Sequence, residues 1–318
     1  MAKYKETKGS SVQNFSSDPA NPIEGQVWYN TTSDTLKLSN GPLLSSWATG
    51  NSMNTSRLSV AGAGTQTAAL GFGGRSNPGA TTAVTESYNG TNWTEVNDLN
   101  SARKYLAGCG ATNTAALAVG GVPGAAFTET WNGTNWTEVN DLNSPKQYFA
   151  AAGTNTAALA FGGYPPTAKT ESYNGTNWTE VNDMNTAREG LAGAGTNTAA
   201  LAFGGTPPVT AKTESWNGTN WTEVNDLNSA RRFFGSAGKT NTAALAFGGN
   251  PTGAVTESWN GTNWTEVSDL NTARRYLAGT GTNTAALAFG GYTPTSGNAT
   301  AATEEWNVSG GTETISTE

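Results

Sequence analysis

The feature that most constrains the fold of this chain is a repeat of about 43 residues. The string NTAALAFGG occurs four times without change, and six glycine pairs end similar apolar segments. A tryptophan within the motif (Y/W)NGTNWTEV recurs every 42 or 43 residues, at Trp93, Trp136, Trp178, Trp221 and Trp264. Self-similarity of this period is typical of solenoids and propellers, in which each unit shields its neighbour from water.

Each unit divides into four expected strands. Residues 274–281 are small and apolar, which suits an inner strand, and residues 284–291 form an apolar run that two glycines end. After a variable loop, TESW and WTEV alternate on either side of NGTN. Asn-Gly between alternating segments is a strong hairpin signal, because both residues accept a positive φ. The pattern therefore predicts a four-stranded meander in each unit.

Six such units account for roughly residues 49–308. The predicted fold class is all-β, a six-bladed β-propeller with four-stranded blades and a short N-terminal arm. We expect residues 1–44 to form the arm and a small hairpin, and residues 45–318 to form the propeller. The last unit lacks a regular fourth strand. Residues 45–57 look like an outer strand without inner partners, so we predict that they complete the last blade, with TETIST near the C-terminus as the competitor.

Composition argues against several classes of function. The formal net charge of −7 disfavours binding to the phosphate backbone of nucleic acids. The chain has no histidine, the commonest general base and metal ligand, and we expect no metal and no cofactor. No segment is apolar over the roughly 18 residues that a membrane helix needs, and the N-terminus lacks the pattern of a signal peptide. We interpret the single cysteine, Cys109, as a small buried residue.

The recurring charged residues fit structural roles better than catalysis. Each unit offers a glutamate on its third strand, such as Glu171, and another on its fourth, such as Glu180. Paired carboxylates can hydrolyse glycosides, but identical copies in every blade are better interpreted as exposed residues of outer strands. The aspartate of NDLN could bind calcium, yet the loop offers few oxygens, so we interpret it as a turn residue. An arginine, or Lys146, precedes each inner strand, and we expect it to form an ion pair or to stack between blades.

Two positions vary while the scaffold repeats, and such loop positions often carry recognition. One follows the glycine pair, and the other stands two residues after the recurring arginine or Lys146. We predict that residues of both sets bind a ligand. The candidate binding residues are Tyr105, Tyr148, Tyr164, Phe233, Tyr276, Tyr292, Arg75 and Asn250. Aromatic rings beside polar groups suit a sugar, whereas the alternative is that these rings only plug the central channel.

One unit contains Gly248-Gly249 after an apolar strand, then Trp259, Trp264 and Arg274. This order of a glycine pair, two aromatics and an arginine resembles the kelch repeat, although the NGTN turn makes the gap between the aromatics shorter than usual. Kelch repeats form β-propellers, so the resemblance implies the same fold. In kelch propellers these loops open on one face and often bind the partner, so the resemblance implies that both sets of variable positions lie on one face.

The segment SSDPANPIEGQVWYNTTSDTLKLSNG resembles the N-terminal part of tail-fibre and other structural proteins of marine phages, which also carry kelch-like arrays rich in NGTNWTEVNDLNTAR. The resemblance implies a non-enzymatic virion protein of the tail fibre, tail or capsid surface, assembled in the host cytoplasm. The arm would dock to other virion proteins and the propeller would bind a host-surface glycan or protein; a homo-oligomer is compatible with this role. Two alternatives are a propeller enzyme acting on polysaccharide, as a glycosidase or lyase, and an intracellular kelch adaptor.

Overall fold

The computed structural model describes residues 12–18, 26–39, 44–77, 79–309 and 312–314. The chain divides into two compact units, Ser46–Asn307 and a small unit formed by Met1–Ser45 with Val308–Glu318. The propeller predicted for residues 45–318 is therefore too long at its C-terminal end. Residues 1–11 of the predicted docking arm, and parts of its remainder, lie outside the described residues. The described part contains no helix long and apolar enough to cross a membrane.

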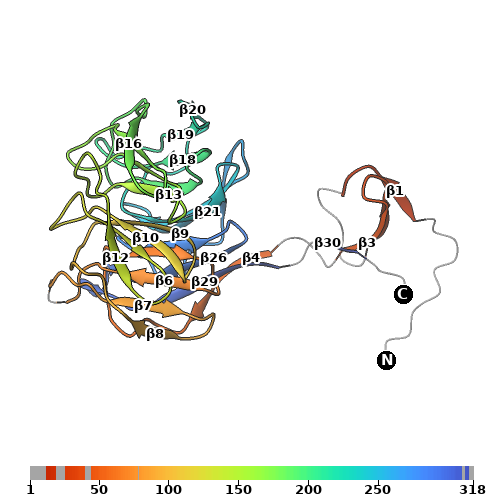
Figure 1. Cartoon of the computed structure of the whole chain (residues 1–318). Helices are drawn as coiled ribbons and strands as arrows, with labels where there is room; N and C mark the ends of the chain where they lie inside the picture. Colours follow the sequence, from red (N-terminus) through yellow and green to blue (C-terminus); the bar gives the residue numbers. More distant parts are fainter. Residues whose placement is uncertain (1–11, 19–25, 40–43, 78, 310–311, 315–318) are drawn as a thin grey trace. The chain divides into compact units, whose positions relative to one another are not determined.

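The larger unit consists of six four-stranded antiparallel sheets, which are the blades of a propeller (Figure 1). Blades 1 and 2 contain β5 (Ala61–Gly64), β6 (Ala69–Phe72), β7 (Thr85–Tyr88) and β8 (Trp93–Val96), then β9 (Ala107–Thr112), β10 (Ala115–Val119), β11 (Thr128–Trp131) and β12 (Trp136–Val139). Blades 3 and 4 contain β13 (Ala150–Gly153), β14 (Ala158–Phe161), β15 (Thr170–Tyr173) and β16 (Trp178–Val181), then β17 (Ala192–Gly195), β18 (Ala200–Phe203), β19 (Thr213–Trp216) and β20 (Trp221–Val224). Blades 5 and 6 contain β21 (Gly235–Thr240), β22 (Ala243–Gly249), β23 (Gly253–Trp259) and β24 (Trp264–Val267), then β25 (Ala278–Gly281), β26 (Ala285–Phe289), β29 (Thr303–Ser309) and β4 (Leu44–Gly50). The short pair β27 (Tyr292–Thr293) and β28 (Asn298–Ala299) lies in the loop before β29.

The blades close into a ring through their innermost strands. Contacts run in the order β5, β9, β13, β17, β21 and β25, and β25 in turn contacts β5. The last blade is completed by the N-terminal strand β4, which lies beside β29 (Figure 1). The competitor segment forms β30 (Thr312–Thr314), which pairs with β3 (Thr35–Ser39) of the small unit instead. The predicted six-bladed propeller with four-stranded blades is confirmed.

The second strand of each blade forms the core. In blade 3, for example, Leu159 and Phe161 are fully buried, because neighbouring blades cover both faces of the sheet. A strand covered on both faces carries a continuous apolar run rather than an alternation. Phe161 also contacts Trp221 of blade 4 edge to face, with ring centroids 5.0 Å apart. The repeated apolar run therefore serves both the blade and its neighbour.

The motif tryptophan of each blade donates a hydrogen bond to the preceding blade. Trp136 donates its indole N–H to Thr85 Oγ1 at 3.1 Å, and Thr85 begins the third strand of blade 1. The equivalent bonds are Trp178–Thr128, Trp221–Thr170, Trp264–Thr213, Trp47–Thr256 and Trp93–Thr303. Trp47 of β4 thus occupies the sixth motif position, and the six bonds run around the whole ring.

A buried ion pair lies in each blade. Arg103 Nη2 is 2.8 Å from Glu129 Oε1, and Asn100 donates its backbone and side-chain N–H groups to Glu129 Oε2 at 2.7 and 2.8 Å. The equivalent pairs are Arg57–Glu86, Lys146–Glu171, Arg188–Glu214, Arg231–Glu257 and Arg274–Glu304. The predicted ion pair of the recurring arginine is confirmed.

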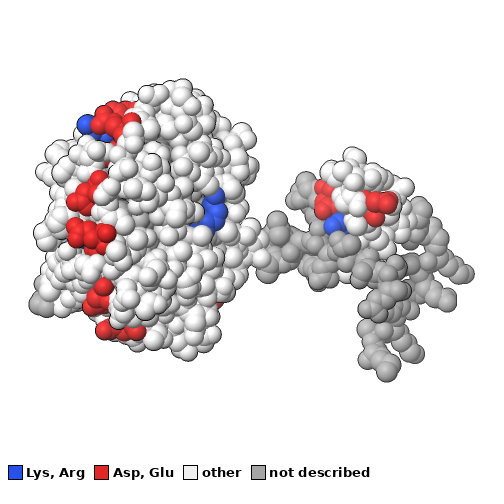
Figure 2. All heavy atoms as spheres, in the orientation of Figure 1, with Lys and Arg blue, Asp and Glu red and all other residues white. Residues whose placement is uncertain are grey.

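The interpretation of the third-strand glutamates as exposed is wrong. The side chain of Glu129 is 2% exposed, and Arg103 and Asn100 supply the donors that its burial requires. The fourth-strand glutamates are exposed; the side chain of Glu180, for example, is 51% exposed. Acidic side chains accordingly run along the outer strands β8, β12 and β16 in Figure 2.

The NGTN hairpins use asparagine differently from the prediction. In the first hairpin only Gly90 has a positive φ, of 90°, and Asn89 does not. Instead, Asn89 Oδ1 accepts the N–H groups of Thr91 and Asn92 at 2.9 and 2.8 Å. The asparagine is therefore needed for its side-chain acceptor, which stabilises the turn as an Asx turn.

The small unit is a four-stranded sheet built from both ends of the chain. β1 (Gln13–Phe15) pairs in parallel with β2 (Val27–Asn30), β2 pairs antiparallel with β3, and β30 is the other edge strand. Trp28 is fully buried, and its indole N–H donates to Asp18 Oδ1 at 3.1 Å. Asp18 also accepts from Asn30 Nδ2 at 2.8 Å.

Candidate ligand-binding site at the channel mouth

One end of the central channel is ringed by the residues that stand two positions after each recurring cation. These six residues, which we call the channel mouth, line a cavity of about 100 Å³: Ser59, Tyr105, Tyr148, Gly190, Phe233 and Tyr276. Tyr105 and Tyr148 stack with ring centroids 4.1 Å apart, and Phe233 and Tyr276 stack at 4.6 Å. Tyr148 also contacts Phe233 at 5.3 Å. The four rings form a crescent, and Ser59 separates its two ends in the ring order.

All six residues of the channel mouth have a left-handed backbone, with φ between 55° and 62°. For a bulky residue this conformation costs about 1–2 kcal/mol. A chain of backbone hydrogen bonds between blades accompanies it; Phe233 N, for example, donates to Gly190 O at 2.8 Å, and Gly190 N to Tyr148 O at 2.7 Å. Gly190 shows that glycine fits this position, yet four of the six positions hold aromatic residues. Backbone strain of this kind concentrates at functional sites.

The other predicted residues form a second layer around the mouth. Each follows a glycine pair and is bonded through its backbone to the residue just before a mouth position. Arg75 N donates to Leu58 O at 2.9 Å, and Tyr292 N donates to Arg275 O at 2.7 Å. The same pairing joins Asn250 to Arg232 and Tyr164 to Gln147. The two predicted sets therefore lie together, and Tyr164, which is 48% exposed, is the most accessible of them.

Four cations flank the mouth: Arg75, Lys104, Arg232 and Arg275. Lys104 Nζ lies 5.3 Å from the centroid of Tyr105, and Arg275 Cζ lies 4.7 Å from that of Tyr292. Of the four, only Arg75 was among the predicted binding residues. The signal for the others was the dibasic pair in RKY, RRF and RRY, in which the first residue enters the buried ion pair and the second reaches the mouth.

The charges at the mouth are predominantly positive. Burial raises the pKa of Tyr276, while the charges of Arg275, Arg232 and Arg75 act in the opposite direction. Glu189 is the acidic residue in this layer; burial raises its pKa and the charge of Arg232 lowers it. The tyrosine phenol is therefore neutral near pH 7, and it offers a hydroxyl group beside several guanidinium groups.

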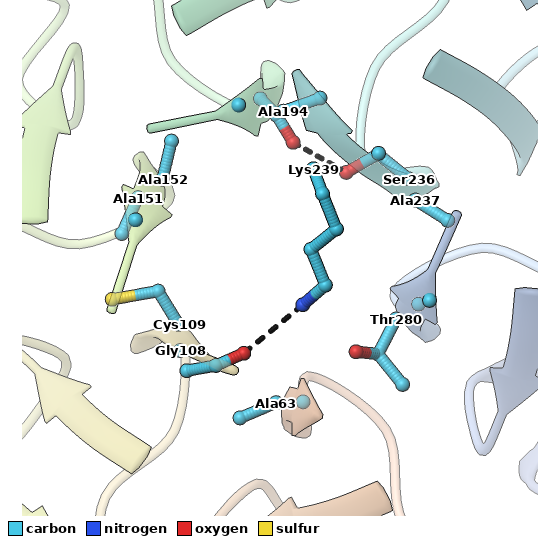
Figure 3. Close-up of a pocket in the computed structure, with 18 residues that line it drawn as sticks. Ala63, Gly108, Cys109, Ala151, Ala152, Ala194, Ser236, Ala237, Lys239 and Thr280 are labelled. Atoms are coloured by element: carbon cyan, nitrogen blue, oxygen red, sulfur yellow. Dashed lines mark hydrogen bonds between the residues drawn. The ribbon is translucent and has the colours of Figure 1, made fainter. Parts of the chain in front are cut away.

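Lys239 distinguishes the opposite end of the channel (Figure 3). It stands at a β-bulge of β21, and its side chain crosses the channel to donate from Nζ to Gly110 O at 3.0 Å. The cavity here is about 80 Å³ and is lined mostly by glycine and alanine. Cys109 also lines it; burial raises the pKa of the Cys109 thiol to about 12, and the charge of Lys239 acts in the opposite direction. Cys109 is buried, as predicted.

The recurring acidic residues have structural contacts in the described part of the chain. The Glu86 carboxylate accepts from Arg57 at 2.9 Å and from Asn54 N at 2.6 Å. Asp98 Oδ1 accepts the backbone N–H of Thr85 at 3.0 Å, at the start of the third strand of its blade. No group of three or more His, Cys, Asp or Glu that could hold a metal occurs among the described residues.

The closed ring of six four-stranded blades, with its loop-lined channel mouth, defines a six-bladed β-propeller, and its fold matches that of a kelch propeller. The solved structure of YjhT, a kelch-repeat propeller protein, matches with a TM-score of 0.65 and 12% sequence identity, covering 83% of this chain and 99% of that one. At this identity the likeness shows the fold alone. No protein-family model matches the chain, and no curated protein matches it. These comparisons give no support to the resemblance to phage proteins.

Proposed function

We propose that this protein is a non-enzymatic component of a phage virion that binds a host-surface glycan at the channel mouth. The observation that carries the binding part is the crescent of four aromatic rings on left-handed backbone. Glycine at these positions would avoid the strain. We infer that aromatic residues stand there because their rings are needed for binding. Sugars have apolar faces and hydroxyl groups, which suit rings set beside polar side chains.

The plug alternative explains the rings but not their surroundings. A plug needs only apolar contact, whereas the mouth cavity is lined by three tyrosines and is flanked by four cations. A ligand at this cavity would rest on the mouth rather than thread through the ring. The side chain of Lys239 crosses the channel at the other end and would obstruct a polymer.

The division into two units supports a role in which the small unit docks to a particle and the propeller is presented to the host surface. The strands next to the small unit in the chain, β4 and β29, are neighbours in blade 6, and β30 pairs with β3 in the small sheet. Both ends of the propeller chain therefore lead into one small unit, which suits a docking module. The assignment to a virion depends on the resemblance of the N-terminal segment, and the docking partner would be another virion protein.

The test of glycan binding uses the full-length protein on a panel of immobilised bacterial surface oligosaccharides. We expect binding without cleavage, and Tyr105→Ala to weaken it by roughly tenfold, as the loss of a stacked ring implies. Phe127→Ala removes an exposed ring outside the mouth cavity and is the matched control. Equal binding by both variants, or no binding to any oligosaccharide, would overturn the proposed site. Cleavage would favour the enzyme alternative.

The virion assignment has a separate test. Gold-labelled antibodies against the propeller should mark intact phage particles from cells that express the gene. Particles that carry no label would remove the virion from the proposal and leave glycan binding as a separate question.

A further inference from the structure

We infer that the channel mouth contains a subsite for the acidic group of a sugar, at the open end of the aromatic crescent. Three guanidinium groups, those of Arg75, Arg232 and Arg275, would bind a carboxylate or sulfate there. The sugar ring would stack on the neighbouring tyrosines. This inference rests on the proposed glycan binding and names the chemistry of the ligand.

Most cations of the propeller are held in contacts away from the mouth. Six cations are held in the buried ion pairs with third-strand glutamates. Lys169 and Lys212 pair with the exposed Glu180 and Glu223 at 3.1 Å, and Lys239 is bonded to a backbone carbonyl in the channel. The four that remain are those of the mouth: Arg75, Lys104, Arg232 and Arg275. Among the described residues, none of these four makes a salt bridge to a carboxylate.

Three of these cations, although distant in sequence, lie near Tyr276. Ser59 N donates to Tyr276 O at 2.8 Å, which joins blade 1 to blade 6 at the open end of the crescent. Arg75 is bonded to the residue before Ser59, and Arg275 directly precedes Tyr276. Arg232 Cζ lies 5.1 Å from the centroid of Phe233, whose ring stacks on Tyr276 with centroids 4.6 Å apart. The positive charge therefore lies around Ser59 and Tyr276.

The Ser59 hydroxyl is an unpaired polar group in the mouth cavity. Ser59 is only 8% exposed, it lines the mouth cavity, and its hydroxyl has no hydrogen-bond partner. Buried hydroxyl groups almost always have a partner, so one without a partner in a cavity points to a polar ligand. The planar guanidinium fork matches the two oxygens of a carboxylate or sulfate, and the Ser59 hydroxyl can donate a further hydrogen bond.

The surrounding charges favour an acidic sugar over a long polyanion. The outer strands carry exposed glutamates, which repel an extended anionic chain (Figure 2). Glu189, which precedes the first strand of blade 4, is close enough for its charge to act on Tyr148, and the charge of Arg232 acts on Glu189 in turn. Among the described cations of the propeller that have no carboxylate partner, all but Lys239 lie at the mouth, among rings that can hold a sugar. An acidic peptide would use the charges but would not need the aromatic crescent.

The experiment compares a free-acid galacturonate oligosaccharide with its methyl ester by calorimetric titration of the full-length protein. The two probes share the sugar ring and differ in charge. We expect the free acid to bind at least roughly tenfold more tightly, and this preference to weaken at high salt. The variant R75Q/R232Q/R275Q should lose the preference for the free acid. The control K169Q/K212Q removes two exposed cations that pair with fourth-strand glutamates, and it should keep the preference.

Each outcome distinguishes this inference from the proposed function. A sulfated oligosaccharide that binds in place of galacturonate, with the same dependence on the arginines, supports the acidic subsite with sulfate as its group. Equal binding of acid and ester, unchanged by R75Q/R232Q/R275Q, overturns the subsite and leaves glycan binding intact. Binding of polyglutamate but of no saccharide overturns the sugar class, and binding of no probe overturns both. A Ser59→Ala variant, which leaves every arginine in place, should weaken binding of the acid by a smaller factor than R75Q/R232Q/R275Q does.

Discussion

Trp47 and Thr256 are 209 residues apart in sequence, yet the Trp47 indole N–H donates to Thr256 Oγ1 at 3.1 Å. The same bond joins the motif tryptophan of blade 2 to blade 1, where Trp136 and Thr85 are only 51 residues apart. The Trp47 ring also contacts Phe247 of blade 5 edge to face, with centroids 4.9 Å apart. An N-terminal strand therefore supplies the last contact of the ring, in the place where the repeat itself has none.

Removal of the Trp47 side chain should destabilise the whole propeller. We expect Trp47→Ala to lower the free energy of unfolding by about 3–5 kcal/mol, the range for a large core aromatic. Trp47→Phe keeps most of the packing and should cost about 1–2 kcal/mol through the lost hydrogen bond and the smaller ring. Urea unfolding followed by circular dichroism measures both. Trp93→Phe removes the equivalent bond to Thr303 and should cost a similar amount; a Trp47→Ala protein as stable as the wild type would contradict closure through this residue.

Lys146 should be replaceable by arginine with a gain in stability. Lys146 Nζ lies 3.9 Å from Glu171 Oε1, whereas Arg103 Nη2 lies 2.8 Å from Glu129 and Arg103 Nη1 also donates to two backbone carbonyls. Burial lowers the pKa of Lys146 and of Arg103 alike, so both cations need close partners, and Lys146 has only this long contact and one hydrogen bond to Lys169 O at 3.2 Å. We expect Lys146→Arg to raise the free energy of unfolding by about 1 kcal/mol, the value of a net hydrogen bond. The reverse change, Arg103→Lys, is the matched control and should lower it. A loss of stability in Lys146→Arg would mean that blade 3 lacks room for the guanidinium.

The left-handed backbone of the channel mouth predicts an unusual order of stability. Phe233 has a φ of 56°, so we expect Phe233→Gly to be more stable than Phe233→Ala by about 1 kcal/mol, because only alanine keeps the strained conformation. In ordinary strand positions alanine is the more stable of the two. Denaturant unfolding of the two variants checks the prediction. The same comparison at Leu245, a fully buried strand residue, should give the usual order. An alanine variant of Phe233 that is the more stable would show that the position carries no strain.

The contribution of Tyr88 to the free energy of unfolding should change with pH above pH 10. Burial raises the pKa of Tyr88, and its hydrogen bond to the Glu305 carboxylate and the charge of that carboxylate raise it further. The unfolded chain loses this proton near pH 10, while the folded chain keeps it. The stabilising contribution is therefore complete below pH 10 and is lost as the pH rises toward the folded pKa.

The difference in unfolding free energy between the wild type and Tyr88→Phe measures this contribution of Tyr88. We expect the difference to be constant between pH 8 and about 10 and to decrease above that, as denaturant titrations at each pH would show. Tyr173→Phe is the matched control, since burial alone raises the pKa of Tyr173 and the change with pH should be smaller. A difference that stays constant to pH 11 would place the Tyr88 pKa at its ordinary value.

Local patterns were sufficient to predict the blades. The apolar run that contains Leu159, the glycine pair after it and the NGTN turn each report on contacts within one unit, and six copies in register imply a ring. The position of the mouth residues also followed from the pattern, because variable residues stand out against exact repeats. The burial of Glu171 did not follow. Alternation along a strand says which residues share a face, but the cation that permits burial, Lys146, comes from the loop that precedes the blade.

The repeat unit, its four strands and the number of blades follow from the amino-acid sequence, because they depend on hydrophobic periods and turn residues within about 43 positions. The folded structure was needed to show that β30 joins the small sheet, which leaves β4 with Trp47 to complete the ring, and that Arg75, Arg232 and Arg275 lie near Tyr276. The physical reason is closure. When the first and last blades of a ring come into contact, residues about 200 positions apart become neighbours, and no local pattern records that contact.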